Sequence, residues 1–237
     1  MIILKKISFL YKSESSIYIY FSFLLTKILN FFIKRKIVKH KKKHQLLLKK
    51  KKITNDFFSA HAYNFFFYLK KLKPNFDYLE IGSYEGNSAV FVADTFVQSK
   101  IYCVDNWVGN DEYIDHISFS TIESNFDLNV ANYNNILKIK CLSDDFFKNN
   151  NQMYDAIYID GFHHGIQVYK DCLNSWKYLK KDGFLICDDY IWDFYPDFKN
   201  NPCFAINIFL KKVAGSYKLE RVSNSQIFIK KINEHKK

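Results

Sequence analysis

The chain has 237 residues, which is enough for one α/β domain with an extension and for a complete hydrophobic core. Hydrophobic residues make up 48% and aromatic residues 19%, which excludes a disordered chain, and the 7 Gly and 3 Pro exclude collagen-like and loop-rich repeat folds. The net charge of +11 is uneven: residues 1–52 hold 15 of the 35 basic side chains and one acid, whereas the remainder has 20 basic and 23 acidic side chains. The basic character therefore belongs to the N-terminal segment and argues against a nucleic-acid partner.

Residues 1–52 are predicted to form a basic, partly amphipathic extension. Residues 17–33 are strongly apolar, but they are fewer than the roughly 20 residues that a membrane span needs, and Lys27 lies among them. Polar residues recur there at every fourth position, which predicts a narrow polar stripe along a helix. Two interpretations stay open. The helix packs on the domain or on a second copy and is followed by a solvated basic linker, or it lies with the polybasic run on an anionic membrane surface.

The main domain is predicted to span residues 53–237 and to begin with a helix over 57–72. A short apolar run over 78–81 then has the length of a buried strand. It contains one acid, Glu80, and leads into a glycine turn and a helix. A strand, a glycine loop and a helix N-terminus bring backbone N–H groups together around a ligand. The glycine spacing differs from the dinucleotide fingerprint, and the acid would suit a ligand with an ammonium group.

The stretch Leu79-Glu80-Ile81-Gly82-Ser83-Tyr84-Glu85-Gly86-Asn87-Ser88-Ala89-Val90 resembles the first motif of class I S-adenosylmethionine-dependent methyltransferases. It is most similar to the catechol O-methyltransferase-like and macrocin O-methyltransferase-like branches. The resemblance implies an α/β fold with a Rossmann-like seven-stranded sheet, an antiparallel last strand and helices on both faces. It also implies that the methionine end of S-adenosylmethionine is held by Glu80, Gly82, Tyr84, Gly86 and Ser88.

Later strand ends carry the other groups that a nucleoside needs. Residues 100–104 are predicted to form the second strand, which ends at Asp105, an acid placed to accept both ribose hydroxyls. Residues 118–128 are predicted to be helical, and residues 136–141 to be the third strand. In the resembled families the following turn contacts the adenine ring, and the resemblance assigns this role to Ser143 and Asp144. A helix N-cap at Ser143 is the structural alternative.

Two further strand ends are acidic. A strand over 154–159 ends in Asp160-Gly161-Phe162-His163-His164, and a strand over 184–187 ends in Asp188-Asp189. In metal-dependent O-methyltransferases the corresponding positions hold Mg²⁺, so the resemblance implies that Asp160, Asp188 and Asp189 are metal ligands, which suits a hard cation. His163 stands where a lysine base is usual, and a histidine can do the same work near neutral pH. His164 is the alternative base.

The remaining elements are predicted from pattern alone. They are a helix over 166–180, a turn over 181–183, a helix over 201–214, and a hairpin over 217–222 and 226–229. Five scattered cysteines, without a Cys-x-x-Cys pair, indicate free thiols in a reducing, cytoplasmic location.

The sequence therefore predicts transfer of a methyl group from S-adenosylmethionine to a hydroxyl of a small molecule or glycan, assisted by Mg²⁺. In this mechanism Asp160 and His163 are the catalytic residues. The alternatives are a metal-independent N- or O-methyltransferase and a non-catalytic protein of the same fold that acts as a membrane-associated partner. A related hydroxylase-like branch shares the sheet and similar acids, and a NAD enzyme is disfavoured by the glycine spacing.

Overall fold

The computed structural model describes residues 2–109 and 119–233. The first residue of the helix predicted over 118–128 lies outside the described residues. The chain divides into two compact units, and each is described by itself. One unit comprises residues 32–150, and the other comprises residues 1–31 together with 151–237. The predicted boundary after residue 52 stays a prediction.

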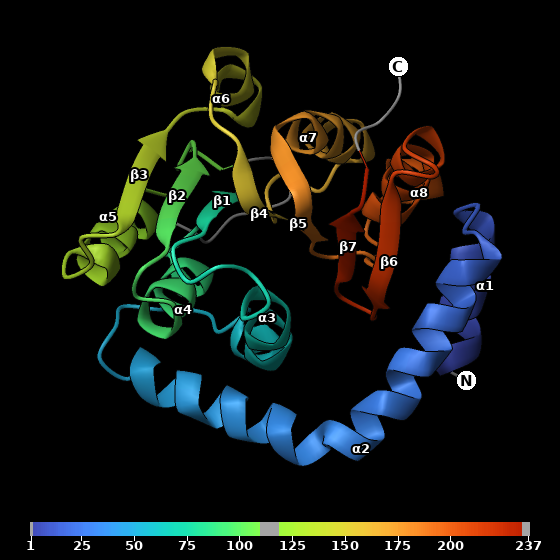
Figure 1. The fold of residues 1–237 in the computed structure, drawn as a ribbon, viewed down its shortest axis with the longest axis horizontal. Coiled ribbons are helices and arrows are strands. Elements are labelled where there is room, and N and C mark those ends of the chain that lie inside the picture. The colour runs from blue at the N-terminus through green and yellow to red at the C-terminus, as the bar shows by residue number, and fades with distance from the viewer. Residues whose placement is uncertain (1, 110–118, 234–237) are drawn as a thin grey trace. The chain divides into compact units, whose positions relative to one another are not determined.

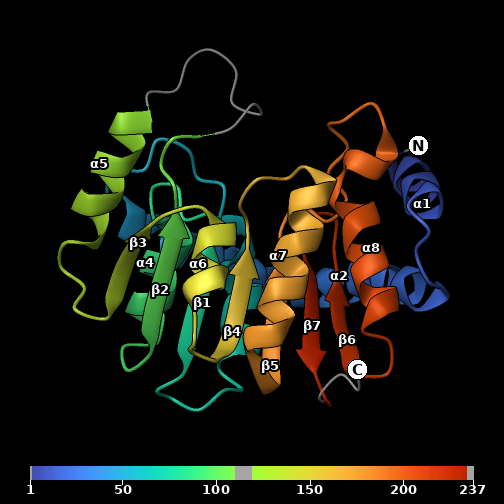
Figure 2. The ribbon, with the colours of Figure 1, turned by 90° about the horizontal axis from the view of Figure 1, so that it is seen from above.

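Seven strands form one sheet in the order β3-β2-β1-β4-β5-β7-β6 (Figures 1 and 2). The predicted methyltransferase-type sheet with a reversed last strand is thereby confirmed. β7 runs antiparallel to both β5 and β6, whereas the pairs β1–β2, β2–β3 and β4–β5 are parallel. The strands are β1 (Asp77–Ile81), β2 (Lys100–Asp105), β3 (Ile136–Lys140), β4 (Tyr154–Ile159), β5 (Leu179–Cys187), β6 (Tyr217–Val222) and β7 (Ile227–Lys231).

In the unit of residues 32–150, the parallel strand β1 is buried except at its first residue, and its neighbour β2 is buried at Ile101, Cys103 and Val104, as their apolar runs require. The unit contains a 3₁₀ turn η1 (Ser59–His61) and the helices α3 (Ala62–Leu69), α4 (Asn87–Thr95), α5 (Phe119–Val130) and α6 (Ser143–Asn149). The helix predicted over 57–72 is thus shorter and begins with a 3₁₀ turn. Leu142, not Ser143, holds the N-cap position of α6.

In the unit of residues 1–31 and 151–237, the long helices α7 (Gly165–Tyr178) and α8 (Pro202–Lys212) lie side by side, and the 3₁₀ turn η2 (Phe198–Asn200) precedes α8 (Figures 1 and 2). The turn predicted over 181–183 was wrong as an element boundary, because these residues lie inside β5. The pairing of β4 with β5 shifts register at this point, so the strand keeps its hydrogen bonds on either side of an irregularity.

The N-terminal extension is helical for most of its length, in α1 (Ile2–Lys12) and α2 (Ile17–Leu48). The polybasic run was expected, in one interpretation, to be a solvated linker, but it continues the helix to Leu48. Lysine is a good helix former, and one side of this part of α2 is buried at His44 and Leu48. Among the described residues α2 alone has the length and apolar composition that a membrane span requires.

Candidate active site

The glycine loop between β1 and α4 contains backbone conformations that favour glycine. Gly82 and Gly86 have φ of 86° and 79°, a region that glycine adopts without a steric penalty. A Cβ atom at position 86 would lie 3.0 Å from the ring of Phe126, so the loop has no room for a side chain there. Tyr84, between the glycines, also has a positive φ of 47°. Non-glycine residues adopt this conformation at a cost and are concentrated at functional sites.

Asp105, the predicted ribose ligand, is the acceptor that organises this loop. Its Oδ2 atom accepts hydrogen bonds from the backbone N–H groups of Ser83 and Tyr84, both at 2.9 Å. Its Oδ1 atom accepts one from the N–H of Trp107 at 2.8 Å, and the Trp107 indole in turn donates to the carbonyl of Tyr84. Three of about four lone-pair positions on the carboxylate are therefore used within the protein. The role at the ribose stays a prediction.

Glu80 is buried in β1, directly before the loop. Its Oε2 atom accepts a hydrogen bond from the hydroxyl of Tyr78 at 2.9 Å, while its Oε1 atom is buried without a hydrogen-bond partner among the described residues. Burial raises the pKa of Glu80 to about 7, although the nearby hydroxyls of Ser88, Tyr78 and Ser83 oppose this shift. A buried carboxylate oxygen that lacks a partner suits a cationic ligand such as the ammonium group of S-adenosylmethionine.

No role was predicted for Glu85 from the sequence, but the structure places it at the centre of a hydrogen-bond network. Its carboxylate accepts hydrogen bonds from the backbone N–H of Thr54 at 2.6 Å, from the Thr54 hydroxyl at 3.0 Å and from the Asn125 amide at 2.8 Å. Asn129 donates both to the carbonyl of Glu85 and to that of Lys52. The glycine loop is thereby fastened to the segment that follows α2. The sequence signal for this network was an acid inside the glycine loop, between Gly82 and Gly86.

Ser143 and Asp144 lie in the first turn of α6, in the same unit as the glycine loop. Ser143 is half-buried and Asp144 is exposed. An exposed acid and a half-buried hydroxyl at a helix start can both bind a polar edge of a ligand. Their predicted contact with adenine stays a prediction.

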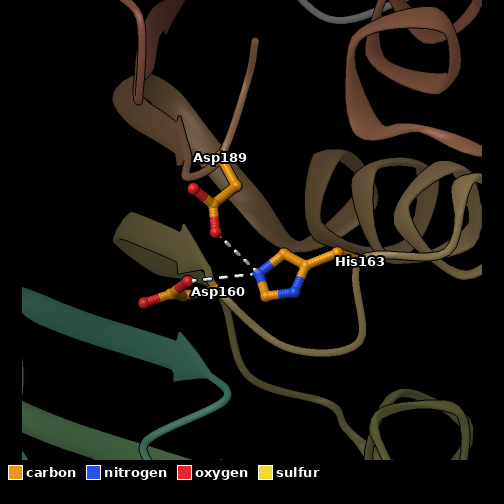
Figure 3. Close-up of side chains that lie close together, drawn as sticks. All are labelled: Asp160, His163 and Asp189. Atoms are coloured by element: carbon orange, nitrogen blue, oxygen red, sulfur yellow. Dashed lines mark ion pairs between the residues drawn. The ribbon is translucent and has the colours of Figure 1, made fainter. Parts of the chain in front are cut away.

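The second cluster of acids follows β4 and β5 in the other unit. Oxygen atoms of Asp160 and Asp189 and the Nε2 atom of His163 lie within 4.8 Å of one another, a spacing that can hold a metal ion. Nε2 of His163 is 3.5 Å from Oδ1 of Asp160 and 3.3 Å from Oδ2 of Asp189, and the imidazole points between the two carboxylates (Figure 3). The ring packs against Trp192 in an edge-to-face arrangement, with the centroids 5.0 Å apart.

Asp188, the third predicted ligand, is turned to other partners. Its Oδ2 atom accepts hydrogen bonds from the Tyr158 hydroxyl and from the Gln226 amide, the latter at 3.0 Å, and its Oδ1 atom accepts one from the N–H of Asp189 at 2.8 Å. The Tyr158 hydroxyl also lies 2.8 Å from Oδ2 of Asp160. The structure therefore brings together Asp160 and Asp189 with His163, and joins Asp188 to them through Tyr158. Neither Tyr158 nor Gln226 was identified from the sequence, since both lie within predicted strands.

The chemistry of this cluster favours a cation. One tyrosine hydroxyl carries one proton and cannot donate to both Asp160 and Asp188, so two ionised carboxylates would repel each other across it. Burial and the charge of Asp188 raise the pKa of Asp160 well above its ordinary range, although His163 opposes the shift. Asp189 has a positive φ of 48°, a strain located at the cluster. Two carboxylates and an imidazole are a donor set that a divalent ion would fit.

His164, the alternative base, is placed differently from His163. Its ring packs against Phe162 at 5.9 Å and against Tyr195 at 5.1 Å between centroids, and the residue holds the N-cap position of α7. His163 is therefore the histidine that the structure places beside the carboxylates.

Comparison with known proteins defines the class. A protein-family model described as a methyltransferase domain matches residues 79–190. This range contains the glycine loop and both clusters of acids. Together with the seven-stranded sheet and its reversed last strand, it shows that the chain has the class I S-adenosylmethionine-dependent methyltransferase fold. Residues 79–190 therefore form a methyltransferase domain.

Solved structures with this fold include several O-methyltransferases. An O-methyltransferase from Bacillus cereus in complex with S-adenosylhomocysteine is 12% identical, with 89% of this chain and 98% of that chain covered and a TM-score of 0.53. The O-methyltransferase TomG from Streptomyces achromogenes, in complex with S-adenosylmethionine, is 10% identical, with 70% and 77% covered and a TM-score of 0.52.

A third structure is MycE, a methyltransferase of the mycinamycin pathway in complex with Mg, S-adenosylhomocysteine and mycinamycin VI. It is 13% identical, with 83% of this chain and 54% of that chain covered and a TM-score of 0.56. At these identities the likeness shows the fold alone. No curated protein matches the sequence.

Proposed function

We propose that this methyltransferase methylates a hydroxyl group of a small molecule or sugar and that a divalent cation, Mg²⁺ in the cell, assists the reaction. The observation that carries the proposal is the cluster of Asp160, His163 and Asp189, whose ligand atoms lie within 4.8 Å of one another. The O-methyltransferases among the structures of the same fold, and the Mg in the MycE complex, support it.

On the cofactor side, Glu80 offers a buried oxygen without a partner to the ammonium group of S-adenosylmethionine. The loop between Gly82 and Gly86, with Tyr84 and Ser88, would hold the methionine end, while Asp105 would take the ribose and Ser143 and Asp144 the adenine. Because Asp105 already fixes the N–H groups of the loop, its first effect is to preorganise the cofactor site before the ligand arrives.

On the acceptor side, Asp160 and Asp189 would hold the cation with His163 or Asp188. A bound divalent cation supplies a positive charge that orients an acceptor hydroxyl and lowers its pKa. If Asp188 is the third ligand of the cation, Nε2 of His163 can accept the proton of the hydroxyl, because the carboxylates at 3.3 Å and 3.5 Å stabilise the imidazolium that forms. The oxygen would then attack the methyl carbon in line with the C–S bond, so that the O–C bond forms as the C–S bond breaks and S-adenosylhomocysteine leaves as the product.

The first test is binding of S-adenosylhomocysteine by calorimetry. We expect a dissociation constant between about 1 μM and 1 mM, the usual range for enzyme substrates. Asp144→Ala is expected to weaken binding, whereas Asp145→Ala, its exposed neighbour in the same helical turn, serves as the matched control. Binding that is absent under all conditions would overturn the assignment of the cofactor site.

The second test follows formation of S-adenosylhomocysteine with a panel of phenol and sugar acceptors, with Mg²⁺ and with EDTA. We expect turnover that requires the cation and that Asp189→Asn abolishes. Turnover that neither EDTA nor this variant changes would instead support the metal-independent alternative, in which the acids have structural roles.

A further inference from the structure

The first half of α2, residues 17–31, turns its polar stripe toward the protein. Thr26 is only 3% exposed. One residue on, the Lys27 ammonium donates to Oδ1 of Asn224, in the β6–β7 turn, at 3.2 Å, and Asn30 accepts a hydrogen bond from Arg221. A helix on the surface of a water-soluble protein usually shows the opposite arrangement, with its polar side chains outside.

The apolar side chains of the same half point away from the protein. Ile19 and Phe23 anchor the helix in the core, but Phe21, Leu25 and Ile28 are 67%, 54% and 57% exposed. With their neighbours they form an exposed apolar surface, which also includes Ile17, Tyr18, Leu24, Leu29 and Phe31. A groove of about 830 Å³ opens beside it, lined mainly by apolar residues of α2 and of β6. A contiguous apolar surface of this kind indicates a binding surface rather than scattered exposed residues.

The second half of α2 has the opposite character. Here the face toward the protein contains His44, whose ring packs edge-on against Phe58 and Phe91 and whose Nε2 lies 2.6 Å from Oδ1 of Asn87. The outer face is basic. Its exposed cationic residues are Lys34, Arg35, Lys36, Lys39, Lys41, Lys42 and Lys43, and the exposed Lys49 and Lys50 follow directly after the helix. Between Glu14 and Asp56 the sequence contains no acid, so nothing on this helix neutralises the charge.

We propose that α2 docks the enzyme on the surface of an anionic lipid bilayer, with the apolar side chains of residues 17–31 in the interface and the lysines of residues 34–50 on the lipid phosphates. Exposed apolar and basic groups that follow each other in one helix are what such a surface binds. The hydrogen bonds of Lys27 and Asn30 to the β6–β7 hairpin hold the helix on the protein, which fits docking rather than spanning.

Other occupants fit less well. A second copy would bring together two segments of residues 1–52, each with 15 basic residues and one acid, and these would repel each other. A nucleic acid would use the basic half but would leave the apolar surface of residues 17–31 in water. A bilayer alone accounts for both halves. The proposal concerns docking and does not depend on which acceptor the enzyme methylates.

The test is flotation of the full-length protein with vesicles of phosphatidylcholine alone or with about one third phosphatidylglycerol, without cofactor or metal. We expect binding to the anionic vesicles only, weakened by salt and reversed by alkaline carbonate. Leu25→Ser/Ile28→Ser is expected to lower the partition coefficient at least about tenfold, because apolar area is lost from the interface. Lys41→Gln/Lys42→Gln/Lys43→Gln is expected to lower it roughly 100-fold, at about fivefold per lysine.

Matched controls replace exposed residues elsewhere. Val97→Ser/Leu142→Ser and Lys177→Gln/Lys181→Gln/Lys212→Gln are expected to leave the partition coefficient unchanged. Equal binding to neutral vesicles, or equal loss in the control variants, would overturn the proposal. So would resistance to carbonate, which would show a spanning helix. A stable dimer in sedimentation that Leu25→Ser/Ile28→Ser dissociates, without vesicle binding, would assign the apolar surface to a second copy.

Discussion

The acids at the glycine loop and the acids at the ends of β4 and β5 differ in how many hydrogen-bond donors surround their carboxylates. At the glycine loop, Asp105 and Glu85 each accept three hydrogen bonds from the protein at 2.6–3.0 Å, so both are completed by their own fold. At the ends of β4 and β5, Asp160, Asp188 and Asp189 lie close together. Asp188 accepts three hydrogen bonds, but the Tyr158 hydroxyl that donates one of them is also the neighbour of Asp160 and has only one proton to give. A carboxylate that accepts several hydrogen bonds stabilises the folded state. Carboxylates that lie close to one another repel, and a bound cation relieves this repulsion.

The largest effect on stability is expected for Asp105, whose carboxylate accepts three hydrogen bonds. Asp105→Ala removes the acceptor of three backbone N–H groups and should lower the free energy of unfolding by about 4 kcal/mol, with each charge-assisted bond contributing roughly 1.5 kcal/mol. Urea unfolding followed by fluorescence measures this change. Asp105→Asn, which keeps one oxygen acceptor, should lose about half as much, and Asp145→Ala, at an exposed acid, should lose little. A stable Asp105→Ala protein would break the distinction between the clusters.

Glu80 lies between the two cases, because one of its oxygens is satisfied and the other is not. Its folded pKa of about 7 exceeds the ordinary value of 4.5, so the folded state binds this proton more tightly than the unfolded state does. The free energy of unfolding should therefore fall as pH rises from about 4.5 to about 7, by about 3 kcal/mol in all, and then level off.

Glu80→Gln should remove that part of the pH dependence. The difference between wild type and variant, from urea unfolding at several pH values, isolates Glu80 from other titrating groups. We expect the variant to be the more stable protein at pH 8 and to bind S-adenosylhomocysteine more weakly. A difference that does not change with pH would show that the pKa of Glu80 is the same in the folded and unfolded states.

At the crowded cluster, Asp189→Asn should weaken binding of Mn²⁺, a paramagnetic substitute for Mg²⁺, by at least about 100-fold, because loss of a direct ligand exceeds the effect of a supporting residue. Electron paramagnetic resonance of the free ion measures the affinity. Asp193→Asn, at an exposed acid four residues further on, is the matched control. Equal Mn²⁺ affinity in both variants would show that the cation binds at another site or that the protein has no cation site.

The smallest effect is expected for Tyr158→Phe. This substitution removes the hydroxyl that joins Asp160 to Asp188, but it replaces none of the proposed metal ligands. Mn²⁺ affinity should fall by about tenfold, the lower end of the range for a supporting residue. The free energy of unfolding of the metal-free protein should change little or fall, since two carboxyl groups lose a shared partner. An affinity equal to that of the wild type would show that Asp188 acts independently of Asp160.

Local pattern was sufficient to identify the strands, the glycine loop and the acids at the strand ends. Buried parallel strands read as short apolar runs, and a turn that needs positive φ requires glycine at positions such as 82 and 86. These features depend on neighbouring residues in the sequence, so Glu80, Asp105, Asp160, Asp188 and Asp189 could be named. The reversed last strand was implied by the family resemblance, and the hairpin pattern near the C-terminus fits it.

What each side chain contacts was decided by the tertiary structure. Whether Asp188 or His163 joins Asp160 and Asp189 depends on where Tyr158, in β4, and Gln226, directly before β7, direct their polar atoms. The polar stripe of α2 was visible in the sequence, but only packing against Asn224 and Arg221 shows that it faces the protein and leaves the apolar side outside. Periodicity defines the faces of a helix, whereas contacts between residues far apart in the chain determine which face is buried.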